Sequence, residues 1–170
     1  MTIDVKQLAD DISSISEMTP DSTVDDGEEA LSDVSDDAAL PQRGGTYEII
    51  EVATRRCLTV EKGKLVLAHE SSGNKACHWR CEKKEGWFGF SNAVTARYLG
   101  YNSNSELVAE AGHHKAWEYI HILPTVAGYY KLLVIQGWKL SEVAVERRND
   151  KLVIRQDGGS AWKFRRALYT

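Results

Sequence analysis

The side chains best suited to hold a ligand lie in one polar stretch near the middle of the chain. They combine an aromatic ring, two amides and two imidazoles, in Tyr101, Asn102, Asn104, His113 and His114. Amides and imidazoles exchange hydrogen bonds with polar ligands, and an aromatic ring offers a flat apolar face. We therefore expect these five side chains, placed on hairpin loops, to form a binding site for a sugar or a peptide.

The residue types that support catalysis or metal binding do not occur at suitable spacings. Cys77, His78 and Cys81 lie too close together for a zinc motif, and Cys81 falls on the same strand face as Trp79. The pair His113 and His114 has no acid or cysteine at a fixed spacing, so it predicts no catalytic triad. We expect no enzyme, no metal and no cofactor. The cysteines, Cys57 included, are expected to be buried, reduced thiols.

Three repeats of about 40 residues organise the chain around these loops. A charged residue followed by Leu, Val and an apolar residue starts at positions 64, 106 and 151, and each copy precedes a Gly-containing loop and a tryptophan. A leucine also recurs every 41 residues before each copy. Residues fixed in every repeat are expected to form the core, which gives the set Leu58, Leu99, Leu140, Trp79, Trp117 and Trp162. Trp87 and Trp138 do not recur at the repeat spacing, and they are candidates for partly exposed, functional aromatic residues.

Each repeat contains four short runs rich in β-branched and aromatic residues, separated by Gly, Asn, Asp and Ser. This pattern predicts twelve strands and an all-β fold, with repeats at about 44–85, 86–127 and 128–168. A β-propeller also has four-stranded repeats of this length, but it needs at least four of them.

Three such repeats, each with one buried aromatic residue, resemble the β-trefoil superfamily over residues 44–168. Cys57-Leu58-Thr59-Val60, followed by Leu65-Val66-Leu67 and His78-Trp79, resembles one lobe of a ricin-type lectin; fascin-like and intracellular fungal trefoils share this skeleton. The resemblance implies a sugar site built on an aspartate after the Cys-Leu phrase and a Gln-x-Trp triplet. Here Thr59, Gly100 and Ser141 stand at the aspartate positions, and all three triplets lack the glutamine. Galactose binding of the ricin kind is therefore not expected.

Residues 1–41 differ in composition from the rest. They hold twelve acidic residues, one basic residue and no aromatic residue, a net charge of −11. Low hydrophobicity with high charge predicts a disordered tail. The spacing of Val5, Leu8, Ile12 and Ile15 also fits a short helix over 4–18, although an isolated helix of this length is marginal in water.

The remainder of the chain carries 20 basic and 13 acidic residues, a net charge of +7. Arg147, Arg148, Arg165 and Arg166 supply two of its basic pairs and are the expected basic face. The function predicted first is a non-enzymatic protein-interaction module that uses the hairpin loops and this face, with the acidic tail competing for access.

The alternative is a cytosolic carbohydrate-binding lectin with a non-standard sugar site. Binding of polyanions or nucleic acid is a weaker alternative, because the basic residues are spread over all three repeats. The expected partner is thus a protein or a glycan, with nucleic acid disfavoured and a monomer favoured. The sequence has no apolar run of 18 residues and does not begin like a secretory signal, which predicts a cytoplasmic or nuclear protein without a membrane span.

Overall fold

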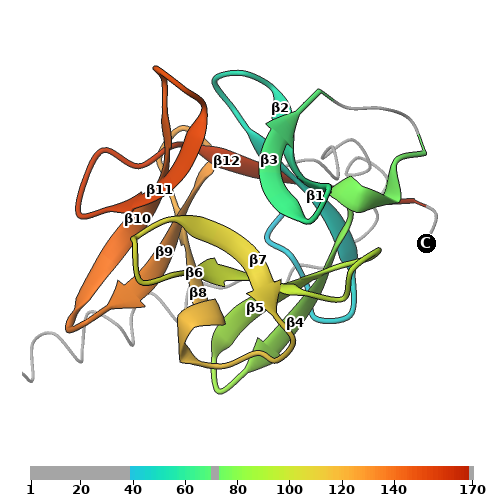
Figure 1. Ribbon diagram of the computed structural model, residues 1–170, viewed down its shortest axis with the longest axis horizontal. Coiled ribbons are helices and arrows are strands. Elements are labelled where there is room, and N and C mark those ends of the chain that lie inside the picture. The colour runs from blue at the N-terminus through green and yellow to red at the C-terminus, as the bar shows by residue number, and fades with distance from the viewer. Residues whose placement is uncertain (1–38, 70–72, 169–170) are drawn as a thin grey trace, which may run out of the picture. The chain divides into compact units, whose positions relative to one another are not determined.

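The computed structural model describes residues 39–69 and 73–168, which form an all-β domain (Figure 1). The predicted disorder and helix of the acidic tail fall on residues outside these ranges. The described elements are β1 (Thr46–Glu51), β2 (Arg56–Glu61), β3 (Lys64–Ala68), η3 (Lys75–Cys77), β4 (Trp79–Lys84), β5 (Trp87–Asn92), β6 (Tyr98–Tyr101), β7 (Leu107–Ala111), η4 (Ala116–Glu118), β8 (Ile120–Pro124), β9 (Tyr130–Gln136), β10 (Lys139–Glu146), β11 (Lys151–Arg155) and β12 (Trp162–Arg166). Both η elements are single 3-10 turns. No helix in the described ranges is long and apolar enough to cross a membrane.

Six of the strands close into a barrel. β1 pairs with β4, β4 with β5, β5 with β8, β8 with β9, β9 with β12, and β12 returns to β1, every pair being antiparallel. Closure leaves the barrel without an exposed edge. Each repeat contributes its first and last strand to this ring, so the three units are held together by backbone hydrogen bonds as well as by side-chain packing.

The two middle strands of each repeat form a hairpin, namely β2–β3, β6–β7 and β10–β11. β7 contacts both β3 and β11. Residues of all three hairpins line a shared hollow. A closed barrel with three hairpins is the arrangement that the sequence repeats predict. The all-β prediction and the twelve strands in three repeats are confirmed.

The barrel core contains aromatic side chains from several strands. Trp79, Phe90, Trp162 and Phe164 are fully buried, and the rings of Phe90 and Phe164 stack with their centroids 5.6 Å apart. Trp79 also donates a hydrogen bond from Nε1 to the carbonyl oxygen of Leu58 at 2.9 Å. These contacts confirm Trp79 and Trp162 as core residues. Leu58 and Leu99 are fully buried as well.

Trp117 is not a core residue, contrary to the prediction. Trp79 and Trp162 are the first residues of β4 and β12, whereas β8 begins at Ile120, which is fully buried. Trp117 lies in η4, three residues before Ile120, and 48% of its surface is exposed. The connecting loops differ in length between repeats, so a tryptophan at a similar distance along the chain does not occupy the same place in the barrel.

Leu140 is the second wrong core prediction, because it is 50% exposed. Leu58 and Leu99 each pair with the last apolar residue of the repeated tetrapeptide, and in the third repeat Val143 makes this pairing, with Ile154. Val143 is fully buried and takes the expected core position. β10 starts directly after a tight turn, so the spacing of 41 residues falls on its exposed beginning rather than on its buried middle.

Candidate functional site

Trp117 presents one face of its indole to solvent from a rigid support. Its other face stacks on the ring of Tyr101 with a centroid distance of 5.1 Å and an interplanar angle of 10°. Tyr101 is buried, and its hydroxyl donates a hydrogen bond to the carbonyl oxygen of Ile135 at 2.6 Å. The orientation of the exposed indole is therefore fixed by a side chain that is itself fixed by the barrel.

A glycine allows η4 to lie against β6. A Cβ atom at Gly100 would lie 2.7 Å from the carbonyl oxygen of Trp117, a distance at which something must shift. The turn is further held by Glu118, whose carboxylate accepts a hydrogen bond from the backbone N–H of Lys115 at 3.2 Å. Burial raises the pKa of the Glu118 carboxyl, although the Lys115 N–H opposes this effect. Gly100 and Glu118 together place Trp117 at the surface.

Two hollows border the Trp117 turn and share His113 and Lys115. The smaller, of about 370 Å³, is lined by Ala111, Gly112, His113, Lys115, Ala116, Trp117 and Glu118. The larger, of about 790 Å³, is lined by Arg43, Gly44, Arg80, Cys81, Glu82, Lys83, Lys84, His113, His114 and Lys115. We call the larger one the basic pocket.

The basic pocket carries a clear excess of positive charge. Five of its lining residues are Lys or Arg, and Glu82 is its one acidic residue. The carboxylate of Glu82 already accepts a hydrogen bond from the Tyr98 hydroxyl at 2.7 Å, and burial together with this contact raises the pKa of Tyr98 to about 12. A hollow lined in this way attracts anions.

The buried ring of His114 supports the loop that separates the two hollows. Its ring stacks on Tyr98 with a centroid distance of 5.6 Å, and its Nε2 lies 3.2 Å from the carbonyl oxygen of Phe88. A carbonyl only accepts, so Nε2 carries a proton. Gly89 makes room for the ring, since a Cβ there would lie 2.5 Å from it. Burial lowers the pKa of His114, whose ring serves as a packing group beneath the loop.

The five predicted ligand residues do not meet in one place. Tyr101 and His114 are buried supports, whereas His113 is exposed and lines both hollows. Asn102 stabilises the β6–β7 turn, its Oδ1 accepting the backbone N–H groups of Asn104 and Glu106, each at 3.0 Å. Asn104 is exposed at that turn. The five predicted residues thus combine buried supporting side chains with exposed ones.

The predicted basic face is partly neutralised by ion pairs. Arg147 lies 2.7 Å from the carboxylate of Glu51, and Arg165 donates from Nε to Glu48 at 2.6 Å. Arg148 and Arg166 are exposed. The pairs with buried carboxylates of β1 give Arg147 and Arg165 a structural role, and the cationic side chains of the basic pocket lie elsewhere.

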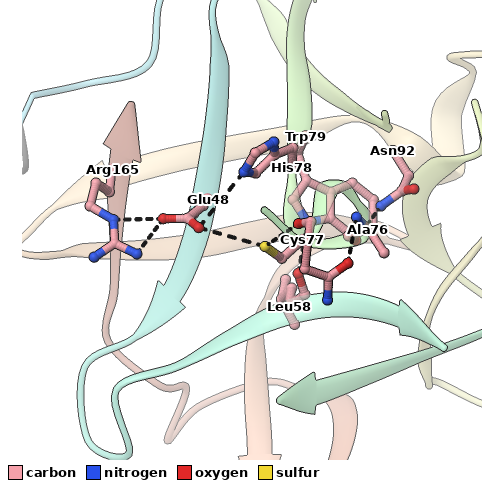
Figure 2. Close-up of polar contacts among 9 residues, drawn as sticks. Glu48, Leu58, Ala76, Cys77, His78, Trp79, Asn92 and Arg165 are labelled. Atoms are coloured by element: carbon pink, nitrogen blue, oxygen red, sulfur yellow. Dashed lines mark hydrogen bonds and ion pairs between the residues drawn. The ribbon is translucent and has the colours of Figure 1, made fainter. Parts of the chain in front are cut away.

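A separate polar cluster brings Glu48 beside Cys77 and His78 (Figure 2). The Cys77 sulfur lies 3.5 Å from Glu48 Oε1, and His78 Nε2 lies 3.8 Å from the same oxygen. Cys81, the third member of the group considered in the sequence, is buried in the barrel core instead. The sequence motif search did not include Glu48, because Glu48 is far from Cys77 and His78 in the sequence and only the folded chain brings β1 beside η3.

No protein-family model and no curated protein sequence matches the chain. Solved structures do match. The Macrolepiota procera ricin B-like lectin in complex with lactose aligns with a TM-score of 0.64 and 16% identity, over 76% of this chain and 100% of the lectin. The Polyporus squamosus lectin bound to the human-type influenza-binding epitope Neu5Acα2-6Galβ1-4GlcNAc aligns with a TM-score of 0.61 and 13% identity, over 75% of this chain and 50% of the lectin.

A third match is the GlcNAcα1-4Gal-releasing endo-β-galactosidase from Clostridium perfringens, with a TM-score of 0.63 and 17% identity. It covers 72% of this chain, which spans only 32% of that enzyme. The three proteins share the barrel and hairpin arrangement at low identity. The protein is a β-trefoil.

The exposed turn that carries Trp117 lies in the second repeat of this trefoil, which departs there from the pattern of the other two repeats. Lys115 and Trp117 stand in the triplet that carries Gln-x-Trp in ricin-type lectins. Trp117 comes three residues before Ile120, the first residue of β8, and both Lys115 and Trp117 are therefore at the surface rather than in the barrel. Gly100, at the position of the expected aspartate, is the signal that a close backbone approach occurs there. The exposure of Trp117 depends on loop length and could not be obtained from the repeat phase.

Proposed function

We propose that this trefoil is a carbohydrate-binding module that recognises an anionic glycan, with Trp117 as the stacking platform and the basic pocket as the charge-recognition site. The observation that carries the proposal is the exposed indole of Trp117, fixed on Tyr101 in the smaller hollow, which shares His113 and Lys115 with the basic pocket. The proposal assigns binding to this site and no catalysis.

The chemistry of the turn suits a sugar ring. The C–H face of a pyranose packs on an indole, and the neighbouring imidazole of His113 and ammonium of Lys115 can hydrogen-bond to its hydroxyl groups. A platform that is already rigid loses little side-chain entropy on binding. The stacked support from Tyr101 therefore favours a binding role for Trp117.

The charge of the basic pocket favours a sugar that carries a carboxylate or sulfate. His113 and Lys115 line both hollows, so a ligand seated on Trp117 can extend an anionic group toward Arg80, Lys83 and Lys84. Lysine and arginine form charge-assisted hydrogen bonds with such groups. Two of the structural neighbours are lectins whose bound ligands are lactose and a sialylated epitope, which supports a glycan as the ligand class.

A glycan array followed by calorimetry with lactose and sialyllactose tests the proposal. We expect the sialylated sugar to bind more tightly than lactose, and the difference to shrink as salt is raised. Trp117→Ala should weaken binding by about tenfold or more, which corresponds to about 1.4 kcal/mol. Trp138→Ala is the matched control, because it removes an exposed indole that lines neither hollow. Equal loss in both variants, or no glycan bound by the wild type, would contradict the proposal.

A specific observation favours protein binding as the second candidate. Trp138 is fully exposed at the turn between β9 and β10, and Leu140 beside it is half exposed. Exposed apolar side chains of this size are typical of protein interfaces. If Trp138→Ala abolishes capture of a partner protein while Trp117→Ala does not, the protein-interaction function replaces the glycan function.

A further inference from the structure

We infer that Glu48, Cys77 and His78 form a binding site for a zinc-like divalent metal ion. This site is separate from the proposed glycan site, since none of its residues lines the two hollows beside Trp117. A thiolate, an imidazole and a carboxylate are all ligands of Zn²⁺, whereas Mg²⁺ and Ca²⁺ take oxygen ligands.

Two of the three distances between the ligand atoms fit one tetrahedral ion. Bonds of about 2.0–2.3 Å to zinc place ligand atoms about 3.3–3.8 Å apart. The sulfur of Cys77 lies 3.5 Å from Glu48 Oε1, and His78 Nε2 lies 3.8 Å from that oxygen. All three ligand atoms lie within 4.8 Å of one another.

Neighbouring groups hold each ligand in position, as in known metal sites. Figure 2 shows Arg165 on one side of the Glu48 carboxylate and the pair Cys77 and His78 on the other. Arg165 Nε donates to Glu48 Oε2 at 2.6 Å, which leaves Oε1 directed at the thiol and the imidazole. A carboxylate with one oxygen held by a guanidinium is therefore oriented to offer the other to a metal.

The backbone around Cys77 is also fixed. The Asn74 side chain caps η3 by accepting the Ala76 N–H at 3.0 Å, and Asn92 donates to the Ala76 carbonyl oxygen at 2.7 Å. Asn74 directly precedes η3, and Asn92, which Figure 2 shows beside Ala76, is the last residue of β5. The segment that carries two of the three ligands is thus anchored before any metal binds.

The protonation chemistry of the site is simple. The Cys77 sulfur lies 2.9 Å from the Asn74 carbonyl oxygen, a contact that requires the thiol form. Metal binding forms a sulfur–metal bond and releases the thiol proton to solvent. The imidazole side of the cluster is the route of entry, because 17% of the His78 side chain is exposed.

Titration of the reduced, tag-free full chain with Co²⁺ tests the site. We expect near-ultraviolet sulfur-to-cobalt charge transfer and visible bands of a tetrahedral ion, saturating at one equivalent and lost when Zn²⁺ is added. Cys77→Ser should abolish the charge-transfer band. His78→Gln, at a partly exposed position that tolerates substitution, should weaken Co²⁺ binding by more than about tenfold.

Three control variants make the result decisive. Cys81→Ala and His113→Gln remove a thiol and an imidazole outside the cluster and should leave the titration unchanged. Cys57→Ser should keep the charge-transfer band, because Cys77 supplies the sulfur. A wild-type protein with no such band overturns the assignment. So does a band that survives Cys77→Ser, or one that disappears in Cys81→Ala while circular dichroism shows that variant folded.

Discussion

The carboxylate of Glu51, fully buried at the end of β1, lies 2.7 Å from the guanidinium of Arg147 in the turn between β10 and β11. Its other oxygen accepts a hydrogen bond from the Thr54 hydroxyl at 2.7 Å. This ion pair joins the first repeat to the third.

Arg147→Ala should therefore destabilise the trefoil by on the order of 3 kcal/mol, because it leaves a buried carboxylate without its cation. Urea unfolding measures the change. Arg148→Ala is the control, since Arg148 is exposed in the same turn and its loss should stay within about 0.5 kcal/mol. Similar midpoints for the two variants would show that the Glu51 carboxylate does not depend on Arg147.

Substituting the tryptophans that recur in the three repeats should distinguish core positions from surface positions. Trp79→Ala removes a fully buried ring that also donates to the Leu58 carbonyl oxygen, and it should cost about 3–5 kcal/mol of unfolding free energy. Trp117→Ala removes a half-exposed ring and should cost about 1 kcal/mol, with its main effect on ligand binding. Chemical denaturation measures both values. Equal losses would place Trp117 in the core after all.

The buried imidazole of His114 should make stability depend on pH. Its folded-state pKa is lowered by burial from the ordinary value of about 6.5, so the unfolded chain binds the proton more readily. The stabilisation is fully present above pH ~6.5 and is lost as the pH falls through the lower, folded-state pKa. Urea midpoints at several pH values between 7.5 and 5 measure this loss.

His114→Phe keeps a ring in the stack and should show a smaller fall in stability across that range. The comparison with wild type also removes the contribution of Glu118, whose raised pKa acts in the opposite direction. His113→Gln is the matched control at an exposed site and should leave the pH dependence as it is. If His114→Phe falls as steeply as wild type, the pH dependence comes from another group.

Deletion of residues 1–38 should strengthen binding to polyanions without unfolding the trefoil. The deleted segment carries twelve acidic residues and one basic residue, whereas the described domain begins with structured contacts such as Gln42 N–H to the Tyr47 hydroxyl at 2.9 Å. A tethered acidic chain competes with an anionic ligand for the basic pocket through its charge.

Heparin chromatography at low and high salt measures this effect. The truncated form should be retained longer at low salt, and the two forms should converge as salt screens the charges. A full-length variant with the acidic residues of 1–38 changed to their amides should behave like the truncated form. Identical retention of wild-type and truncated protein at low salt would show that the segment does not regulate access.

The repeats predicted the fold well because strand alternation and turn residues are local signals. Leu58, Leu99, Trp79 and Trp162 were correctly placed in the core for this reason. Trp117 and Leu140 were misplaced because equal spacing along the chain is not equal position in the barrel when loops and strands differ in length. The contacts of Glu48 with Cys77, and of Glu51 with Arg147, join residues far apart in sequence and depend on the barrel closing.

The pairing of β1 with β12 also governs when this domain can fold. Ile49 and Phe164 are opposite each other in that pair, although one is made at the start of the domain and the other near its end. Contacts between such distant residues slow folding, because a long loop must close before they form. During synthesis β1 can pair with β2 and β4 as soon as the first repeat is made, but its longest pairing, with β12, must wait until β12 has left the ribosome.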